Sequence, residues 1–116
     1  MILVDTSVWV DHLRRGNETL ARSLRDAQVA THPFVIGELA CGNLRTRHQL
    51  LALLARLPTV SPVSHEEALH FLETRNLSGR GLGWVDVHLV AAAVAAQMPL
   101  LTLDRRLAAV HAAIAS

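Results

Sequence analysis

The sequence predicts an α/β protein in which helices cover both faces of a short parallel sheet. Four short apolar segments with strand character alternate with helix-like segments along the 116 residues, and this alternation is typical of a parallel sheet. Hydrophobic residues make up 51% of the chain and aromatic residues only 3%, so we expect a helix-rich structure with an aliphatic core. The length predicts one domain, residues 1–116.

The expected strands are short, and prolines flank two of them. They are Ile2–Val4, Val29–Thr31, Thr59–Val60 together with Val63, and Leu100–Leu103. Two expected helices fill each of the three gaps between strands, and one follows the last strand. The expected helices are Ser7–Arg15, Glu18–Ala27, Pro33–Gly42, Arg47–Leu57, His65–Asn76, Val85–Gln97 and Arg105–Ala115.

Composition excludes several classes of protein. The longest apolar run, from Leu89 to Ala96, is far shorter than the roughly 20 residues needed to cross a bilayer, so we expect no membrane segment. The first strand begins at residue 2 with no basic segment before it, which argues against a secretory signal. The single cysteine, Cys41, excludes a disulfide framework and a cysteine-based zinc site. We therefore expect a cytoplasmic protein.

The charge balance does not by itself predict nucleic-acid binding. The chain has 11 basic and 10 acidic residues and a net charge of +1, whereas nucleic-acid-binding domains are usually basic. Every basic residue is arginine, and several arginines come in close pairs, at positions 14 and 15, 45 and 47, and 105 and 106. Arginine is a good bidentate ligand for phosphate, but a general preference for arginine codons explains the pattern equally well.

Four acidic residues are candidates for a shared site. Asp5 directly follows the first strand and Asp104 follows "LLTL", the last one. Sites in open parallel sheets lie beyond the carboxyl ends of the strands, so these two acids are expected at the same edge. Glu38 lies in the apolar helix "PFVIGELACG", where a solvated role is not expected, and Asp86 lies in the first turn of the most apolar helix. We expect all four to line one cleft at this edge.

Each acid also has a local alternative. Asp5, with Thr6 and Ser7 after it, stands where a helix cap is favoured, and Asp104 could cap the last helix. Asp86 could complement the helix dipole, and Glu38 could be half-buried beside an arginine. One common origin for the four positions is nevertheless simpler than four coincidences.

Four gathered carboxylates imply cation chemistry. They repel one another, and burial raises their pKa values, so such a cluster requires neutralisation. Oxygen ligands select Mg²⁺ or Mn²⁺. A cation site of this kind polarises a phosphodiester and lowers the pKa of a bound water for in-line attack. The sequence leaves open whether one ion binds or two.

The four acids resemble the acidic quartet of a known family. The segments "VDTSVW", "IGELACG", "GWVDVHLVAAA" and "LLTLDRRL" are similar, in order and spacing, to those of PIN-domain ribonucleases, and most of all to the VapC toxins of bacterial toxin–antitoxin pairs. The resemblance covers essentially the whole chain. It implies a three-layer α/β/α fold with about four parallel strands in the order 3-2-1-4. It also implies a Mg²⁺- or Mn²⁺-dependent endoribonuclease, a homodimer, and a cognate antitoxin that inhibits it.

Within the quartet, Asp5 and Asp86 are the expected principal metal ligands. Asp104 and Glu38 would hold a second ion or waters of the first, and all four are expected to be catalytic. Thr6 and Ser7 could orient Asp5, although capping is the simpler role. His88 could donate a proton, but a structural role is favoured because a metal-activated water needs no histidine.

The two tryptophans and the function each allow two interpretations. Trp9 and Trp84 could stack on bases, yet we expect them in the core, because the chain offers few other aromatic residues. The main alternative function is a non-catalytic PIN-like module that binds other proteins. The intact set of four acids argues against it. The sequence identifies neither the RNA target nor the antitoxin.

Overall fold

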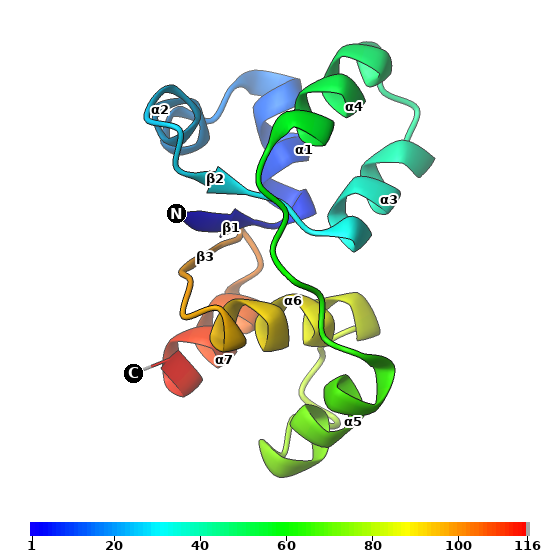
Figure 1. The fold of residues 1–116 in the computed structure, drawn as a ribbon, viewed down its shortest axis with the longest axis vertical. Coiled ribbons are helices and arrows are strands. Elements are labelled where there is room, and N and C mark those ends of the chain that lie inside the picture. The colour runs from blue at the N-terminus through cyan, green and yellow to red at the C-terminus, as the bar shows by residue number, and fades with distance from the viewer. Residues whose placement is uncertain (116) are drawn as a thin grey trace.

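The computed structural model describes residues 1–115 and has three layers. A small parallel sheet lies in the middle, α1 to α4 lie on one side of it, and α5 to α7 lie on the other (Figure 1). The expected α/β/α class is therefore confirmed. Within these residues, no helix is both long and apolar enough to cross a membrane.

The sheet contains three strands in the order β2-β1-β3, all parallel. The strands are β1 (Ile2–Val4), β2 (Val29–Ala30) and β3 (Leu100–Leu101). Leu3 is the pivot of the register, because it pairs with Ala30 on one side and with Leu100 on the other. The most apolar segment of the N-terminal region thus becomes the central strand, which places its carboxyl end between those of its two neighbours.

The third expected strand is reduced to one parallel bridge between Thr31 and Thr59. Thr31 donates its N–H to the Pro58 carbonyl, and Val60 donates to the Thr31 carbonyl. Pro58 and Pro62 have no N–H to extend this ladder, so the pairing stops there. The bridge still lies outside β2, and the spatial order of the four expected segments is therefore 3-2-1-4. The last strand also ends two residues earlier than expected, at Leu101, and the Thr102 hydroxyl that follows it donates to Asp5.

All seven expected helices are present. They are α1 (Thr6–Arg15), α2 (Glu18–Arg25), α3 (Pro33–Cys41), α4 (Arg47–Arg56), α5 (His65–Thr74), α6 (Trp84–Ala95) and α7 (Arg105–Ala115). The expected ends of α2, α5 and α6 were two residues too late. In each case the residue predicted to end the helix, Ala27, Asn76 or Gln97, has a positive φ of 53–54°, which stops the helix.

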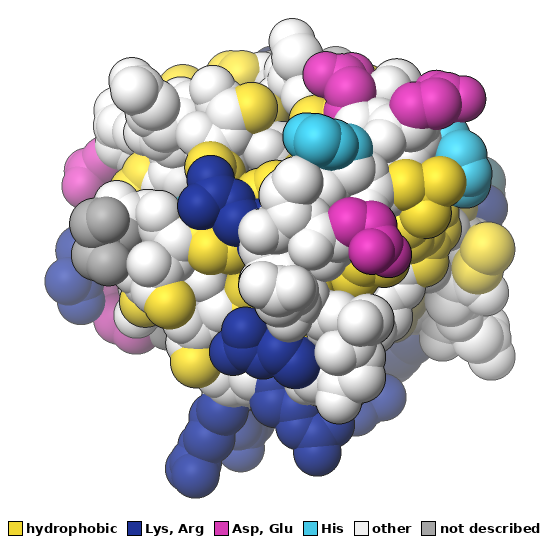
Figure 2. Space-filling view, turned by 90° about the horizontal axis from the view of Figure 1, so that it is seen from below, with side chains coloured by type: hydrophobic (Ala, Val, Ile, Leu, Met, Phe, Trp, Pro, Cys, Tyr) yellow, Lys and Arg dark blue, Asp and Glu magenta, His cyan; other side chains and the backbone are white. Residues whose placement is uncertain are grey.

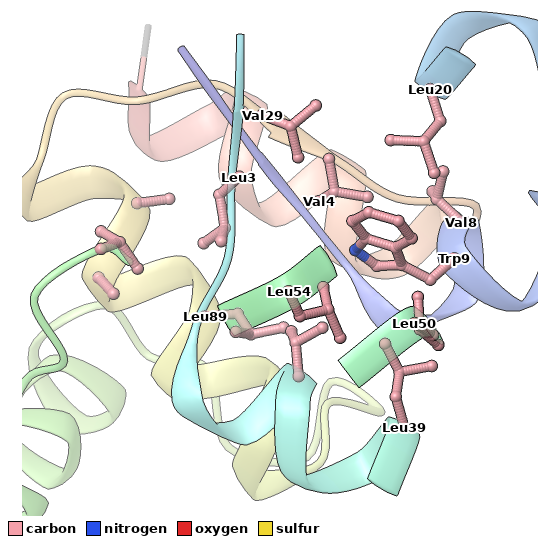
Figure 3. Packing of buried hydrophobic residues seen from close by; sticks show 14 residues of the cluster. Leu3, Val4, Val8, Trp9, Leu20, Val29, Leu39, Leu50, Leu54 and Leu89 are labelled. Carbon is pink, nitrogen blue, oxygen red and sulfur yellow. The ribbon is translucent and has the colours of Figure 1, made fainter. Parts of the chain in front are cut away.

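The core is aliphatic, as the composition predicts. Leu3 and Val4 of β1 are completely buried, and Trp9 of α1 is 1% exposed. Figure 3 shows the Trp9 indole among aliphatic side chains that include Val4 and Leu50, so its expected place in the core is confirmed. A second cluster, which includes Val90 of α6 and Leu107 and Val110 of α7, packs α7 against α6. The two clusters pack α1 on one face of the sheet and α6 and α7 on the other.

Candidate active site

Asp5 is the most firmly held of the four acids. It is only 7% exposed, and its own N–H donates to the Leu101 carbonyl at the end of β3. Its Oδ1 accepts a hydrogen bond from the Thr6 N–H at 2.8 Å. Its Oδ2 accepts from the Ser7 hydroxyl at 2.8 Å and from the Thr102 hydroxyl at 2.7 Å. Three donors therefore satisfy the carboxyl oxygens and fix the orientation of the side chain.

Thr102 joins two of the acids and was not predicted from the sequence. Besides donating to Asp5, its Oγ1 accepts the Asp104 N–H at 3.0 Å. Ser7 makes a parallel link, because its Oγ accepts the Leu103 N–H at 3.1 Å. The turn after β3 is thus fastened to the start of α1. In the sequence, the one indication of this role was that Thr102 is a polar residue at the end of a strand, two positions before Asp104.

Asp86 lies in the first turn of α6 and is under electrostatic strain. Its Oδ2 accepts the Gly83 N–H at 2.9 Å, and this bond closes the start of the helix. Burial raises the pKa of Asp86 above its ordinary value of 3.8. The Gly83 hydrogen bond opposes that shift, and the nearby carboxylates of Asp5 and Asp104 add to it. Three acids from distant parts of the sequence therefore share one electrostatic environment.

Asp104 combines a local role with its place beside the other acids. Its Oδ1 accepts hydrogen bonds from the N–H groups of Arg106 at 2.9 Å and Leu107 at 3.3 Å, so it caps α7. Asp5 caps α1 in a similar way. The capping alternatives considered from the sequence are therefore correct as geometry, but a capping carboxylate keeps acceptor capacity for a further ligand.

Glu38 is exposed, and the expectation that its apolar neighbours would bury it was wrong. The helix α3 turns Val35 and Leu39 into the core and leaves Glu38 in solvent. It is still connected to the others, because the Thr6 hydroxyl donates to Glu38 Oε1 at 2.7 Å. Glu38 thus lies at the margin of the site, one residue removed from Asp5.

His88 and Trp84 of α6 differ in burial. His88 is 4% exposed, and its pKa is lowered by burial and by the charge of His65, so it is neutral at pH 7. Trp84 is 38% exposed, and the prediction that it lies in the core was wrong. It is the first residue of α6, whereas the buried face of that helix consists of small and aliphatic residues further along, from Val87 to Ala93.

Most arginines lie at the surface, and two form ion pairs. Arg15 pairs with Asp11 and Arg25 with Glu18. On the face seen from below, most of the visible arginine side chains gather along one edge. Acidic and histidine side chains lie mainly toward the opposite corner, with hydrophobic atoms between (Figure 2). A role of the arginines in phosphate binding stays a prediction.

The donor set fits a hard cation that takes few protein ligands. Within residues 1–115, no three His, Cys, Asp or Glu side chains come close enough to enclose an ion by themselves. Mg²⁺ usually takes one or two carboxylates and keeps several waters. A cation near Asp5 and Asp86 would also relieve the repulsion that raises the pKa of Asp86. The residues present are therefore suited to such an ion.

Comparison with known proteins identifies the class. The model of the PIN domain family matches residues 2–113, and the chain belongs to this family. The chain is also 46% identical over 110 residues to proteins named "Ribonuclease VapC32" from two strains of Mycobacterium tuberculosis, CDC 1551 / Oshkosh and ATCC 25618 / H37Rv. The aligned region covers 94% of this chain and 89% of each relative. The resemblance inferred from the four acidic segments is thereby confirmed.

Proposed function

We propose that this chain is a VapC-type endoribonuclease that requires Mg²⁺ or Mn²⁺ and hydrolyses RNA phosphodiester bonds. The observation that carries the proposal is the meeting of Asp5, Asp86 and Asp104 in one electrostatic environment at the carboxyl edge of the sheet. The similarity to a protein named as a ribonuclease supports the choice of RNA as substrate.

Asp5 and Asp86 are the residues proposed to hold the cation. A bound divalent cation would supply a water of lowered pKa and would polarise the phosphodiester. Ser7 and Thr102 occupy Oδ2 of Asp5, so Oδ1, which accepts only the Thr6 N–H among the described hydrogen bonds, is the oxygen better placed to face a ligand.

The other two acids are given supporting roles. Asp104 adds negative charge beside Asp86, which strengthens the attraction for a cation. Glu38 is exposed beside Thr6, where it can accept hydrogen bonds from water and orient it. All four acids are thus assigned to the catalytic apparatus, two as ligands and two around them.

The biological role is proposed from the family. We assign the chain as the toxin of a toxin–antitoxin pair, a single domain that works as a homodimer and is inhibited by a cognate antitoxin. The name of its relatives supports this assignment. The alternative, a PIN-like module that only binds proteins, gives no reason for three carboxylates to converge at a cost in electrostatic repulsion.

The test is cleavage of mixed cellular RNA by the purified chain. We expect cleavage with Mg²⁺ or Mn²⁺, none in EDTA, and products with a 5′-phosphate and a 3′-hydroxyl, because water is the nucleophile. Cyclic phosphate ends, or full activity in EDTA, would show that the acids are not the catalytic apparatus. A chain that stays inactive with every cation, alone and after removal of bound protein, would favour the interaction module.

A further inference from the structure

The exposure of two aromatic side chains is not explained by the catalytic roles proposed above. The chain has only two Phe, two Trp and no Tyr. Trp9 is buried, yet Phe34 is 39% exposed and Trp84 is 38% exposed. An aliphatic protein with so few rings gains stability by burying them, so two partly exposed rings in contact with one common side chain indicate a binding surface.

The two rings are held in place by histidines. His88 lies between them, with ring centroids 4.8 Å from Phe34 and 4.7 Å from Trp84. His32 contacts Phe34 at 5.1 Å and His65 contacts Trp84 at 5.2 Å. All four contacts are edge-to-face, so among residues 1–115 no face of Phe34 or Trp84 is covered by a parallel ring. We refer to Phe34, His88 and Trp84 as the aromatic platform.

The aromatic platform is connected to the margin of the acidic site through α3. Phe34 precedes Glu38 by one turn on α3, and side chains four residues apart on a helix lie about 5–6 Å from each other at Cβ. Trp84 opens α6 two residues before Asp86, and residues two apart on a helix do not face each other. Trp84 is instead connected to Phe34 through His88, which contacts both rings. Each of these two helices therefore contributes both a candidate catalytic acid and an exposed ring.

The charges of the chain provide little affinity for RNA near the acids. The net charge of the chain is only +1, and without a bound cation the carboxylates of Asp5, Asp86 and Asp104 repel the phosphates of an approaching strand. Binding through phosphate contacts and counterion release is therefore weak near the acids. Stacking of bases on aromatic rings supplies affinity that does not depend on charge and tolerates different bases.

We propose that the aromatic platform stacks a nucleobase of the RNA beside the scissile phosphodiester, with Trp84 as the principal contact. This inference rests on the proposed ribonuclease function and adds a substrate-binding site to it. The occupant is a base of single-stranded RNA, because Phe34 lies on the same face of α3 as Glu38, at the margin of the site where the phosphodiester must lie. A second copy of the chain or another protein partner is the competing occupant that the experiment tests.

The experiment measures binding of a short fluorescent oligouridylate to the full-length chain with Asp86→Asn, which prevents cleavage. Adding Trp84→Leu should weaken binding about tenfold, within the range for one stacked base, and should leave the slope of affinity against salt unchanged, because no phosphate contact is lost. Trp84→Phe, which retains a ring, should restore most of the affinity. Leu69→Ser is the matched control, because Leu69 is 42% exposed on α5 and carries no ring.

A second readout uses the fluorescence of the chain itself. Trp9 is buried, so bound RNA should quench mainly Trp84. An oligonucleotide with abasic positions should neither quench Trp84 nor distinguish the Trp84→Leu chain from its parent. Thermal unfolding of each variant shows whether a change in binding reflects misfolding, and the milder Trp84→Phe variant allows the test if Trp84→Leu fails to fold.

Three results would overturn the inference. The first is equal affinity of the Trp84→Leu chain and its parent for oligouridylate. The second is a fall in affinity that is as large for abasic as for intact RNA. The third is a loss of oligomer mass in ultracentrifugation on Trp84→Leu but not on Leu69→Ser, which assigns the surface to a second copy. RNA cleavage by the unmodified chain is measured in parallel. Cleavage by that chain supports the ribonuclease proposal even if the stacking proposal is overturned.

Discussion

Asp5 and Asp86 are both proposed to bind the cation, yet their surroundings are opposite. Asp5 ends the central strand, is 7% exposed, and accepts three hydrogen bonds. Asp86 begins a helix and accepts one hydrogen bond, from Gly83, among those described. Its pKa is raised by burial and, beyond the opposing Gly83 bond, by two neighbouring carboxylates.

The difference shows that the two proposed ligands play different structural parts: Asp5 is held rigidly, whereas Asp86 is repelled by neighbouring carboxylates. Hydroxyl and amide donors hold the Asp5 side chain in place whether or not a ligand is present. Asp86 has little such compensation, so most of its relief must come from a bound cation. Asp5 therefore contributes to folding as well as to the proposed chemistry, whereas Asp86 lowers stability in the absence of the cation.

The largest effect should be on cleavage, and it should be common to both residues. Asp5→Asn and Asp86→Asn should each reduce the rate of RNA cleavage at saturating Mg²⁺ by at least about 100-fold, since each removes a proposed ligand. Single-turnover cleavage of a defined RNA measures this loss, with Asp26→Asn, an exposed acid after α2, as the control. Retention of more than a tenth of the activity in either variant would remove that residue from the site.

The stability of the Asp5 variant should separate the two acids. Asp5→Asn should lower the free energy of unfolding by about 2 kcal/mol, because the amide nitrogen replaces one acceptor oxygen. That oxygen is either Oδ1, which accepts the Thr6 N–H, or Oδ2, which accepts the Ser7 and Thr102 hydroxyls. Urea unfolding in EDTA, followed by circular dichroism, measures the change. An unchanged free energy of unfolding would mean that these bonds are not structural.

Thr102 tests whether the bracing of Asp5 matters for activity. Thr102→Val keeps the shape but removes the hydroxyl that joins Asp5 to Asp104. Cleavage should fall about tenfold and require more Mg²⁺, the usual cost of losing a supporting contact behind a ligand. Thr102→Ser should restore both quantities. Equal defects in the Ser and Val variants would point to packing of the methyl group instead.

The smallest effect, and the one of opposite sign, is expected at Asp86. The raised pKa means that the folded chain binds more protons than the unfolded chain between pH 3.8 and the folded-state value, so its stability falls as the pH rises through that window. At pH 7 without a cation, Asp86→Asn should therefore stabilise the fold, by less than about 1 kcal/mol because water screens a partly exposed group. Urea unfolding at pH 7 and at pH 4 gives the comparison, and the gain should shrink at the lower pH. Destabilisation at pH 7 would show that the Gly83 bond outweighs the repulsion.

Some features could be read from the chain because they depend on nearby residues. The apolar run Ile2–Val4 forms a buried strand, and the helices begin within one residue of the predicted positions, since caps and prolines mark their starts. The ends of α2, α5 and α6, two residues before Ala27, Asn76 and Gln97, could not be predicted in the same way. Each of these three residues has a left-handed backbone although none is a glycine, so the sequence gives no local indication of it. The direction of the following segment imposes that conformation.

By itself, the sequence determined the α/β alternation and the strand-end positions of Asp5 and Asp104, because apolar periodicity and chain order are local properties. Tertiary structure decided three other matters. It placed Thr102 against Asp5, 97 positions apart in the chain, it left Glu38 in solvent, and it kept Trp84 at the surface. Each depends on which face of an element meets the sheet. The packing of distant aliphatic side chains sets that choice, and no short stretch of sequence encodes it.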